Sequence, residues 1–150
     1  MQLTDFSDYS LRLVLYLAVH QDRLVQAQEV SRAYGVSRHH MIKVAQRLAD
    51  GGIIESVRGR GGGLRLNRPP HEINVGALVR LTEPHLNFVE CFDDRTNTCP
   101  ISTACGMKAV ILNAQHAFLH VLDQHTVADF LARAPKLIRL WNRAASVTPP

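Results

Sequence analysis

The chain has 150 residues, a hydrophobic content of 46% and a formal net charge of +4. This composition excludes a disordered chain. The chain has no apolar run near the ~20 residues of a membrane span and no basic-then-apolar leader, which predicts a cytoplasmic protein without a membrane partner. The charge is concentrated, because residues 32–68 hold eight Lys and Arg but only two acids, which indicates a polyanion as partner.

The N-terminal region begins with two predicted helices. Residues 5–20 predict the first, because their apolar side chains recur at three- and four-residue steps. Thr4 or Asp5 can cap its start. Residues 26–34 predict a short second helix, which Gly35 ends with a positive φ.

A third helix is expected from Ser37, a good N-cap, to about Ala49. Its inner face is apolar, with a stripe of Met41, Val44, Ala45 and Leu48. Two short helices joined by a tight glycine turn, the second basic on its outer face, form a helix-turn-helix. The residues of this region that are expected to contact DNA are Ser37, Arg38, His39, His40, Lys43 and Arg47.

The segment after this helix predicts a β-hairpin. Residues 53–57 are rich in β-branched side chains, residues 58–63 form a glycine-rich turn, and residues 64–66 alternate apolar and basic side chains. The glycine run fits neither G-x-G-x-x-G nor a P-loop and precedes a strand, so a nucleotide site is not expected. The hairpin is the wing of a winged helix, and its arginines suit the minor groove or its phosphates: Arg58, Arg60 and Arg65.

The second half of the chain predicts a long helix over residues 106–123, beyond a short helix at 74–81 and an irregular stretch at 82–105. Its apolar stripe needs a partner. The expected partner is the same helix of a second subunit, because a dimer can bind two DNA half-sites at once. The alternative is packing against the winged helix of the same chain. One more short helix is expected over 126–132, before a frayed tail that ends in Thr148, Pro149 and Pro150. The stripe consists of Met107, Val110, Ile111, Ala114, Ala117, Phe118, Val121 and Leu122.

The only cysteines are Cys91, Cys99 and Cys105, in the spacing C-x7-C-x5-C. Three thiols cannot all pair as disulfides, and clustered thiolates suit a metal or iron–sulfur centre that takes its fourth ligand from elsewhere. Structural zinc or a thiol redox switch is the alternative. An enzyme is not expected, because no Cys/His/Asp arrangement has the context of a catalytic motif.

The expected fold is mainly α with a small β-hairpin wing: a winged helix-turn-helix followed by a long dimerisation helix. Three segments follow from this reading. Residues 1–81 form the DNA-binding domain, residues 82–105 the cluster-binding loop, and residues 106–150 the dimerisation helix and C-terminal segment.

Four stretches together resemble one known family: residues 1–9 (MQLTDFSDY), 34–41 (YGVSRHHM), 57–63 (VRGRGGG) and 126–131 (TVADFL). They are similar to the winged-helix iron–sulfur repressor family that contains IscR and NsrR, and most of all to its NsrR branch. The resemblance implies a homodimeric transcriptional repressor that binds a double-stranded DNA operator and senses nitric oxide. Nitrosylation of its cluster, expected to be 4Fe–4S rather than 2Fe–2S, would lower operator affinity and derepress nitric-oxide stress genes.

The resemblance also implies a ligand set in which the three cysteines hold the cluster. IscR-like members add a histidine three residues after the last cysteine, where this chain has Lys108, which cannot ligate as an ammonium. NsrR-like members can use an aspartate of the first helix, donated across the dimer, and Asp8 matches it. From the residues alone, Asp8 is better explained as a partner of the helix dipole at the N-terminus of the first helix than as a ligand. The first cysteine interval is also longer than in the relatives. The competing ligands are Glu90, Asp93, Asp94 and His116.

Overall fold

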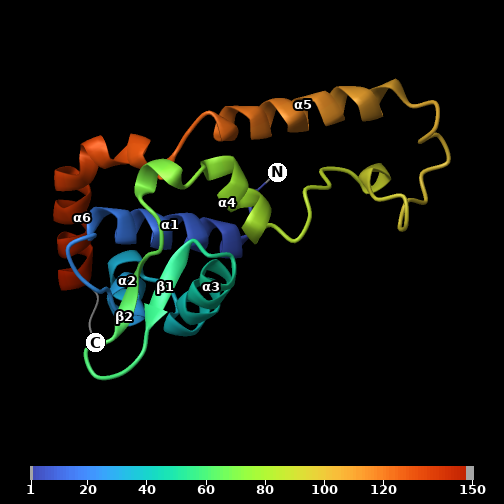
Figure 1. Cartoon of the computed structure of the whole chain (residues 1–150). Coiled ribbons are helices and arrows are strands. Elements are labelled where there is room, and N and C mark those ends of the chain that lie inside the picture. The colour runs from blue at the N-terminus through green and yellow to red at the C-terminus, as the bar shows by residue number, and fades with distance from the viewer. Residues whose placement is uncertain (1, 148–150) are drawn as a thin grey trace.

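The structure is a computed structural model that describes residues 2–147. It is mainly helical with one small antiparallel hairpin, as the sequence predicts (Figure 1). No helix in this range is long and apolar enough to cross a membrane. The elements are α1 (Asp5–Val19), α2 (Ala27–Tyr34), α3 (Arg38–Asp50), β1 (Ile54–Val57), β2 (Gly63–Leu66), η1 (Pro70–Glu72), α4 (Val75–Thr82), η2 (Glu90–Phe92), α5 (Gly106–Asp123), η3 (Val127–Arg133) and α6 (Ala134–Val147).

Helix α1 begins at a threonine cap, as expected. The hydroxyl of Thr4 accepts a hydrogen bond from the backbone N–H of Ser7 at 3.3 Å, which satisfies one of the free donors of the first turn. Ser7 is itself buried, and its hydroxyl donates to Thr82 Oγ1 at 2.9 Å. This bond fixes the start of α1 against the end of α4.

The helix-turn-helix is confirmed, with one difference at its second cap. Gly35 ends α2 with φ 65°, a left-handed conformation that glycine adopts without a steric penalty. Ser37 occupies the N-cap of α3, but its side chain makes no capping hydrogen bond. Ser37 is therefore the N-cap, as expected, but only its backbone carbonyl, which accepts from the Met41 N–H at 3.1 Å, joins the first turn.

The hairpin is anchored at its base and free at its tip. β1 and β2 pair antiparallel, with Ile54 opposite Leu66 and Val57 opposite Gly63. Ile54 and Leu64 are buried, and Leu64 exchanges two backbone hydrogen bonds with Val25, at 2.8 and 3.0 Å. The turn therefore projects from a base that is fixed to the body of the molecule (Figure 1).

The C-terminal segment differs from the sequence prediction. Residues 127–133 form the 3₁₀ segment η3 rather than an ordinary helix, and α6 follows where only a tail was expected. Trp141 of α6 is buried, with its ring 4.6 Å from that of Tyr16 and 5.7 Å from that of Tyr34, centroid to centroid. Burial raises the pKa of Tyr34 to about 12. The tail of residues 148–150 lies outside the described residues.

The prediction failed because α6 is held by tertiary packing. Its burial depends on an aromatic cluster supplied by α1 and α2, which no local pattern reveals. Val127 and Trp141 both belong to the main hydrophobic core, together with Leu13, Leu17, Met41 and Leu48. The C-terminal segment is thus part of the same packed unit as the helix-turn-helix.

Helix α5 is attached to this unit at one end only. The guanidinium of Arg80 in α4 donates to both carboxylate oxygens of Asp123, at 2.6 and 2.7 Å. Gly76 allows this approach, because a Cβ at that position would lie 1.9 Å from Asp123 Oδ1. The other end of α5 and the segment 83–105 extend away from the body (Figure 1).

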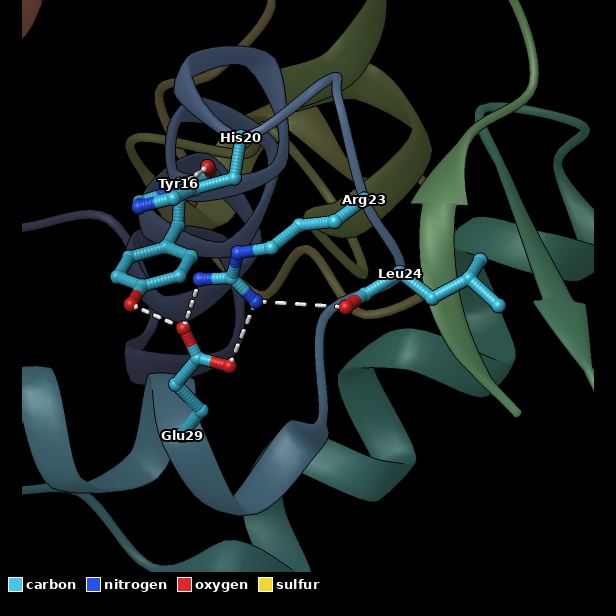
Figure 2. A network of polar contacts seen from close by, with 5 residues as sticks. All are labelled: Tyr16, His20, Arg23, Leu24 and Glu29. Carbon is cyan, nitrogen blue, oxygen red and sulfur yellow. Dashed lines mark hydrogen bonds and ion pairs between the residues drawn. The ribbon is translucent and has the colours of Figure 1, made fainter. Parts of the chain in front are cut away.

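A polar network fixes the turn between α1 and α2 (Figure 2). Tyr16 Oη donates to Glu29 Oε1 at 2.8 Å, and Arg23 binds both oxygens of the same carboxylate. The hydrogen bond from Arg23 lowers the pKa of Glu29, and burial raises that of Tyr16. The ring of His20 stacks on Tyr16 at 4.3 Å. This network holds α2 in the orientation from which the chain turns into α3.

Candidate DNA interface and cysteine site

The outer face of α3 presents cations that have no partner in the described part of the chain. Arg38, His39 and Lys43 are exposed, as is Ser37. The side chains of Arg38 and Lys43 make no hydrogen bond or ion pair with any of residues 2–147. These groups are therefore available to an anion outside the chain.

Two of the expected DNA contacts on α3 have partners inside the protein. Arg47 donates through Nε and a terminal nitrogen to the carbonyl oxygen of Leu81, at 3.1 and 3.0 Å. It thereby satisfies a free carbonyl in the last turn of α4. The ring of His40 is stacked on Tyr9 of α1, with 6.2 Å between centroids. Both side chains lie toward the α1 and α4 side of α3.

The wing arginines also fall into two groups, those without a partner in the described residues and one that forms an ion pair. Arg58 and Arg60 are exposed and, within the described part of the chain, their side chains have no polar partner. Arg65 is paired across the strands with Glu55, at 2.9 Å from Nε and 2.8 Å from a terminal nitrogen. Gly59 and Gly61 have positive φ values of 102° and 80°, so the tip adopts a path that other residues rarely take.

A groove of about 510 Å³ separates α3 from the wing. Its walls are formed by one side of α3, the start of α2 and the hairpin turn, of which only Arg60 does not line the groove. The side chain of Gln26 closes one end by donating to the carbonyl of Gly62. The residues that line the groove from α3 are Ile42, Ala45, Gln46 and Ala49.

The three cysteines lie in the segment between α4 and α5 as free thiols, each half-buried. Their donor chemistry fits an iron–sulfur cluster, which is held by thiolates. Cys105 occupies the N-cap of α5, where the helix dipole favours a negative charge. In the described range 2–147, however, no three cysteine, histidine, aspartate or glutamate side chains converge into a group that could hold a metal ion.

A hydrogen-bonded clamp joins the residues that precede Cys91 and Cys99. Glu90 Oε1 accepts from both the backbone N–H and the hydroxyl of Thr98, each at 2.6 Å. These hydrogen bonds lower the pKa of Glu90. The side chain of Asn97 also accepts from the Cys99 N–H at 3.0 Å. The clamp closes the long first cysteine interval into a loop.

The competing ligand candidates are engaged elsewhere or exposed. Asp93 is not simply solvated, because it pairs with Arg95 at 3.1 Å, which lowers the pKa of Asp93. Asp94 is exposed and lies 3.9 Å from the Lys108 amino group. His116 is exposed on α5.

Asp8 lies on α1 and is paired with Arg12 of the same chain. Arg12 Nε donates to Asp8 Oδ1 at 3.0 Å, and a terminal nitrogen lies 2.5 Å from Oδ2. Within residues 2–147, Asp8 belongs to no group of three or more side chains that could hold a metal ion. The sequence interpretation missed Arg12, although its position four residues after Asp8 is a common spacing for a helix ion pair.

The apolar stripe of α5 divides into two faces. Ile111, Phe118 and Leu122 are half-buried within the chain. The second face remains exposed, and its residues follow steps of three and four, the spacing of a coiled-coil seam. The sequence interpretation did not separate these faces. The exposed face, called the α5 seam below, consists of Met107, Val110, Ala114, Ala117 and Val121.

Comparisons with known proteins find relatives over most of the chain. Residues 3–133 match the Rrf2 family, described as an iron-dependent transcriptional regulator. The chain is 46% identical over 138 residues to the HTH-type transcriptional regulator NsrR of Halalkalibacterium halodurans, covering 91% of this chain and 94% of that protein. It is 42% identical over 141 residues to the regulator of the same name from Bacillus subtilis, covering 93% and 97%.

Solved structures show the same fold. T. potens IscR has a TM-score of 0.72 at 26% identity, over 89% of this chain and 88% of that one. CymR of B. subtilis, a global cysteine regulator, has a TM-score of 0.70 at 22% identity, over 88% and 97%. The chain therefore belongs to the Rrf2 family of iron-dependent transcriptional regulators.

Proposed function

We propose that this chain is a cytoplasmic, homodimeric iron–sulfur repressor that binds an operator and responds to nitric oxide. Its similarity to two regulators named NsrR supports the proposal. The observation that carries it is the combination, in one chain, of two features: cations on α3 and the wing that have no partner among residues 2–147, and three free thiols in the segment that leads into the projecting helix α5. The genes released would be those for nitric-oxide stress.

Operator binding follows from the α3 and wing surfaces. In a winged helix, the second helix of the helix-turn-helix enters the major groove with its N-terminal residues first. Arg38 and His39 lie at that end of α3, and Lys43 lies one turn later. The unpaired Arg58 and Arg60 would meet the adjacent minor groove or its phosphates.

Dimerisation follows from the α5 seam. Met107 and Val110 are 68% and 67% exposed, and Val121 is 55% exposed. A stripe of this kind gains free energy by packing against a copy of itself, because a two-fold axis brings the same residues together. Ala114 and Ala117 at its centre allow two helices to approach closely. A dimer also places two copies of α3 on two operator half-sites.

The cluster ligands in this proposal are Cys91, Cys99 and Cys105 of one subunit and Asp8 of the partner subunit, with a 4Fe–4S cluster rather than 2Fe–2S. The three thiols supply the donors that iron prefers. Asp8 is accessible, because its side chain is 42% exposed. Ligation by Asp8 requires its ion pair with Arg12 to open.

When bound, the cluster supplies iron that nitric oxide binds at the expense of protein ligands. The chain's own residues transmit the loss of a ligand to the DNA-binding helices. Asp8 belongs to α1, whose Leu13 and Leu17 pack in the same core as Met41 and Leu48 of α3. Tying Asp8 to the partner subunit therefore fixes the spacing of the two α3 helices, and releasing it removes that constraint. A shift of a few kcal/mol is enough to change operator occupancy.

A second candidate function starts from the same observation, that the three cysteines are free thiols. In that case they bind zinc or act directly as a redox switch in a regulator of iron–sulfur assembly or redox stress.

Anaerobic purification followed by iron, sulfide and zinc analysis and by gel shifts with and without nitric oxide tests both functions. We expect a coloured protein with iron and sulfide whose DNA binding is lost on exposure to nitric oxide. The Cys91→Ala variant should be colourless and insensitive. A colourless wild-type protein that contains zinc would favour the second function, and DNA binding that ignores nitric oxide would overturn the sensor.

A further inference from the structure

Ile42 is an apolar side chain on the DNA-facing side of α3. It is 46% exposed, whereas the inward stripe of α3, including Met41 and Val44, is buried. Arg38 lies one turn before Ile42 and Gln46 one turn after it, so all three share one line along the helix. The core therefore does not account for the isoleucine at this position.

The residues around Ile42 indicate which kind of ligand it can contact. It lines the groove of about 510 Å³ between α3 and the wing, together with Ala45 and Ala49. Gln46 lines the same groove, but its amide nitrogen is already committed to Asp50 Oδ1 at 2.9 Å. Arg58 of the wing lies on the far wall. The apolar side chains of Ile42, Ala45 and Ala49 thus lie between cationic side chains, Arg38 on α3 and Arg58 on the wing. This arrangement suits a ligand that has a charged backbone and an apolar edge.

We propose that Ile42 is a specificity-determining residue that recognises thymine through its C5-methyl group in the operator's major groove. This inference rests on the proposed DNA-binding function. Among the bases, thymine alone presents an apolar group in the major groove. Isoleucine has no donor or acceptor, so it selects only by apolar contact and shape. Neighbouring Arg38 and Lys43 then hold the backbone or a guanine, while Ile42 supplies preference for thymine.

The test removes only the methyl group. A duplex is first selected from a random library with the reconstituted full-length protein. Each thymine of a half-site is then replaced in turn by deoxyuridine, and affinity is measured by fluorescence anisotropy. One buried methyl is worth about 0.8 kcal/mol, or about fourfold in affinity. We expect wild type to lose about this factor at one or two positions, and Ile42→Ala to lose nothing there.

Lys43→Ala, at the neighbouring position of the same helix, is the matched control. It should bind more weakly at all positions and with a shallower salt dependence, yet keep the deoxyuridine penalty. Thermal melting of Ile42→Ala should match wild type, because the side chain is not part of the core. A wild type that is indifferent to deoxyuridine everywhere, or an Ile42→Ala variant that keeps the penalty, would overturn the inference. Failure to select any duplex would instead overturn DNA binding itself, and the inference with it.

Discussion

Arg12 binds both carboxylate oxygens of Asp8 on the exposed side of α1, at 3.0 Å and 2.5 Å. The same guanidinium lies 5.7 Å from the ring centre of Tyr9 and 5.6 Å from that of Tyr34. Arg12 is therefore fixed by aromatic contacts as well as by charge. The carboxylate proposed as a ligand for the partner subunit is held toward its own chain, and the two roles of Asp8 exclude each other.

Replacement of Asp8 tests the proposed bridge between subunits. Asp8→Ala should still bind iron through its cysteines, but with an altered visible spectrum, and its operator affinity should fall to that of the protein without cluster. The fold should survive, because an exposed i,i+4 ion pair contributes only about 0.3–0.5 kcal/mol. Absorption spectra and gel shifts, both anaerobic, measure the two effects.

Asp5 provides the matched control, because it is the other acid in the first turn of α1. Asp5→Ala should leave the spectrum and the response to nitric oxide unchanged. If Asp8→Ala also leaves both unchanged, Asp8 is only the partner of Arg12, and the fourth ligand must be sought elsewhere.

The clamp between Glu90 and Thr98 predicts how readily Cys91 and Cys99 meet. In a Cys105→Ser background, diamide can oxidise these two thiols to a disulfide. Glu90→Ala removes both hydrogen bonds from Thr98 and should slow this reaction at least about threefold, the scale of a single hydrogen bond, because the loop between the cysteines is no longer closed. Glu90→Gln keeps the accepting oxygen and should react nearly as fast as the parent. Mass spectrometry of alkylated samples follows the kinetics.

Asp94→Ala is the control for charge in the same loop, since Asp94 has only a 3.9 Å contact with Lys108. It should not change the rate. Equal rates in all four proteins would show that the clamp does not position the cysteines.

Local patterns were enough to predict the elements that carry their own signals. Gly35 and the buried stripe of α3 define the helix-turn-helix, and the glycine-rich turn between two short strands defines the wing. Helix α5 begins and ends where its periodicity predicts. Helix α6 was not predicted, because it is held by the packing of Trp141 against Tyr16 and Tyr34. These two residues lie more than a hundred positions earlier in the chain, so no local pattern reveals the contact.

The candidate site was predicted by residue type but not by pairing. The sequence indicates which side chains are cationic, yet only the structure shows that Arg47 binds the Leu81 carbonyl and Arg65 binds Glu55. Arg60, by contrast, has no polar partner among residues 2–147. These pairings depend on tertiary and cross-strand contacts. The sequence alone therefore cannot distinguish the arginines that are paired within the fold from those that are available to DNA.

The α5 seam predicts a dimer that a single charge disrupts. Val110→Glu would place two carboxylates, one from each subunit, in an apolar contact, at a cost of about 3 kcal/mol or more, which is roughly a hundredfold in the dissociation constant. Sedimentation velocity should then show monomers at micromolar concentration. His116→Glu, on the opposite side of α5, should remain dimeric. A dimeric Val110→Glu would place the subunit contact elsewhere.

The Glu29 network predicts a pH-dependent contribution to stability. The pKa of Glu29 is lowered by the hydrogen bond from Arg23, so the folded state favours the carboxylate. This contribution is fully present above the unfolded pKa of about 4.3 and is lost as pH falls through the lower folded value. Glu29→Gln should cost about 1–2 kcal/mol at pH 7. Urea denaturation should show this difference shrinking toward zero at acid pH, whereas Glu55→Gln on the exposed hairpin should change stability by less than about 0.5 kcal/mol.

The unpaired arginine at the wing tip predicts a specific change in the salt dependence of DNA binding. Each phosphate contact contributes about 0.9 to the slope of log affinity against log salt, so Arg60→Glu should weaken binding and reduce the slope by about that amount per subunit. Arg139→Glu makes the same charge change on α6, away from the wing, and should leave the slope nearly unchanged. Arg65→Glu should have a smaller effect on the slope than Arg60→Glu, because Glu55 already neutralises Arg65. An unaltered slope in Arg60→Glu would show that the wing tip does not touch the phosphates, and would leave α3 as the main contact with DNA.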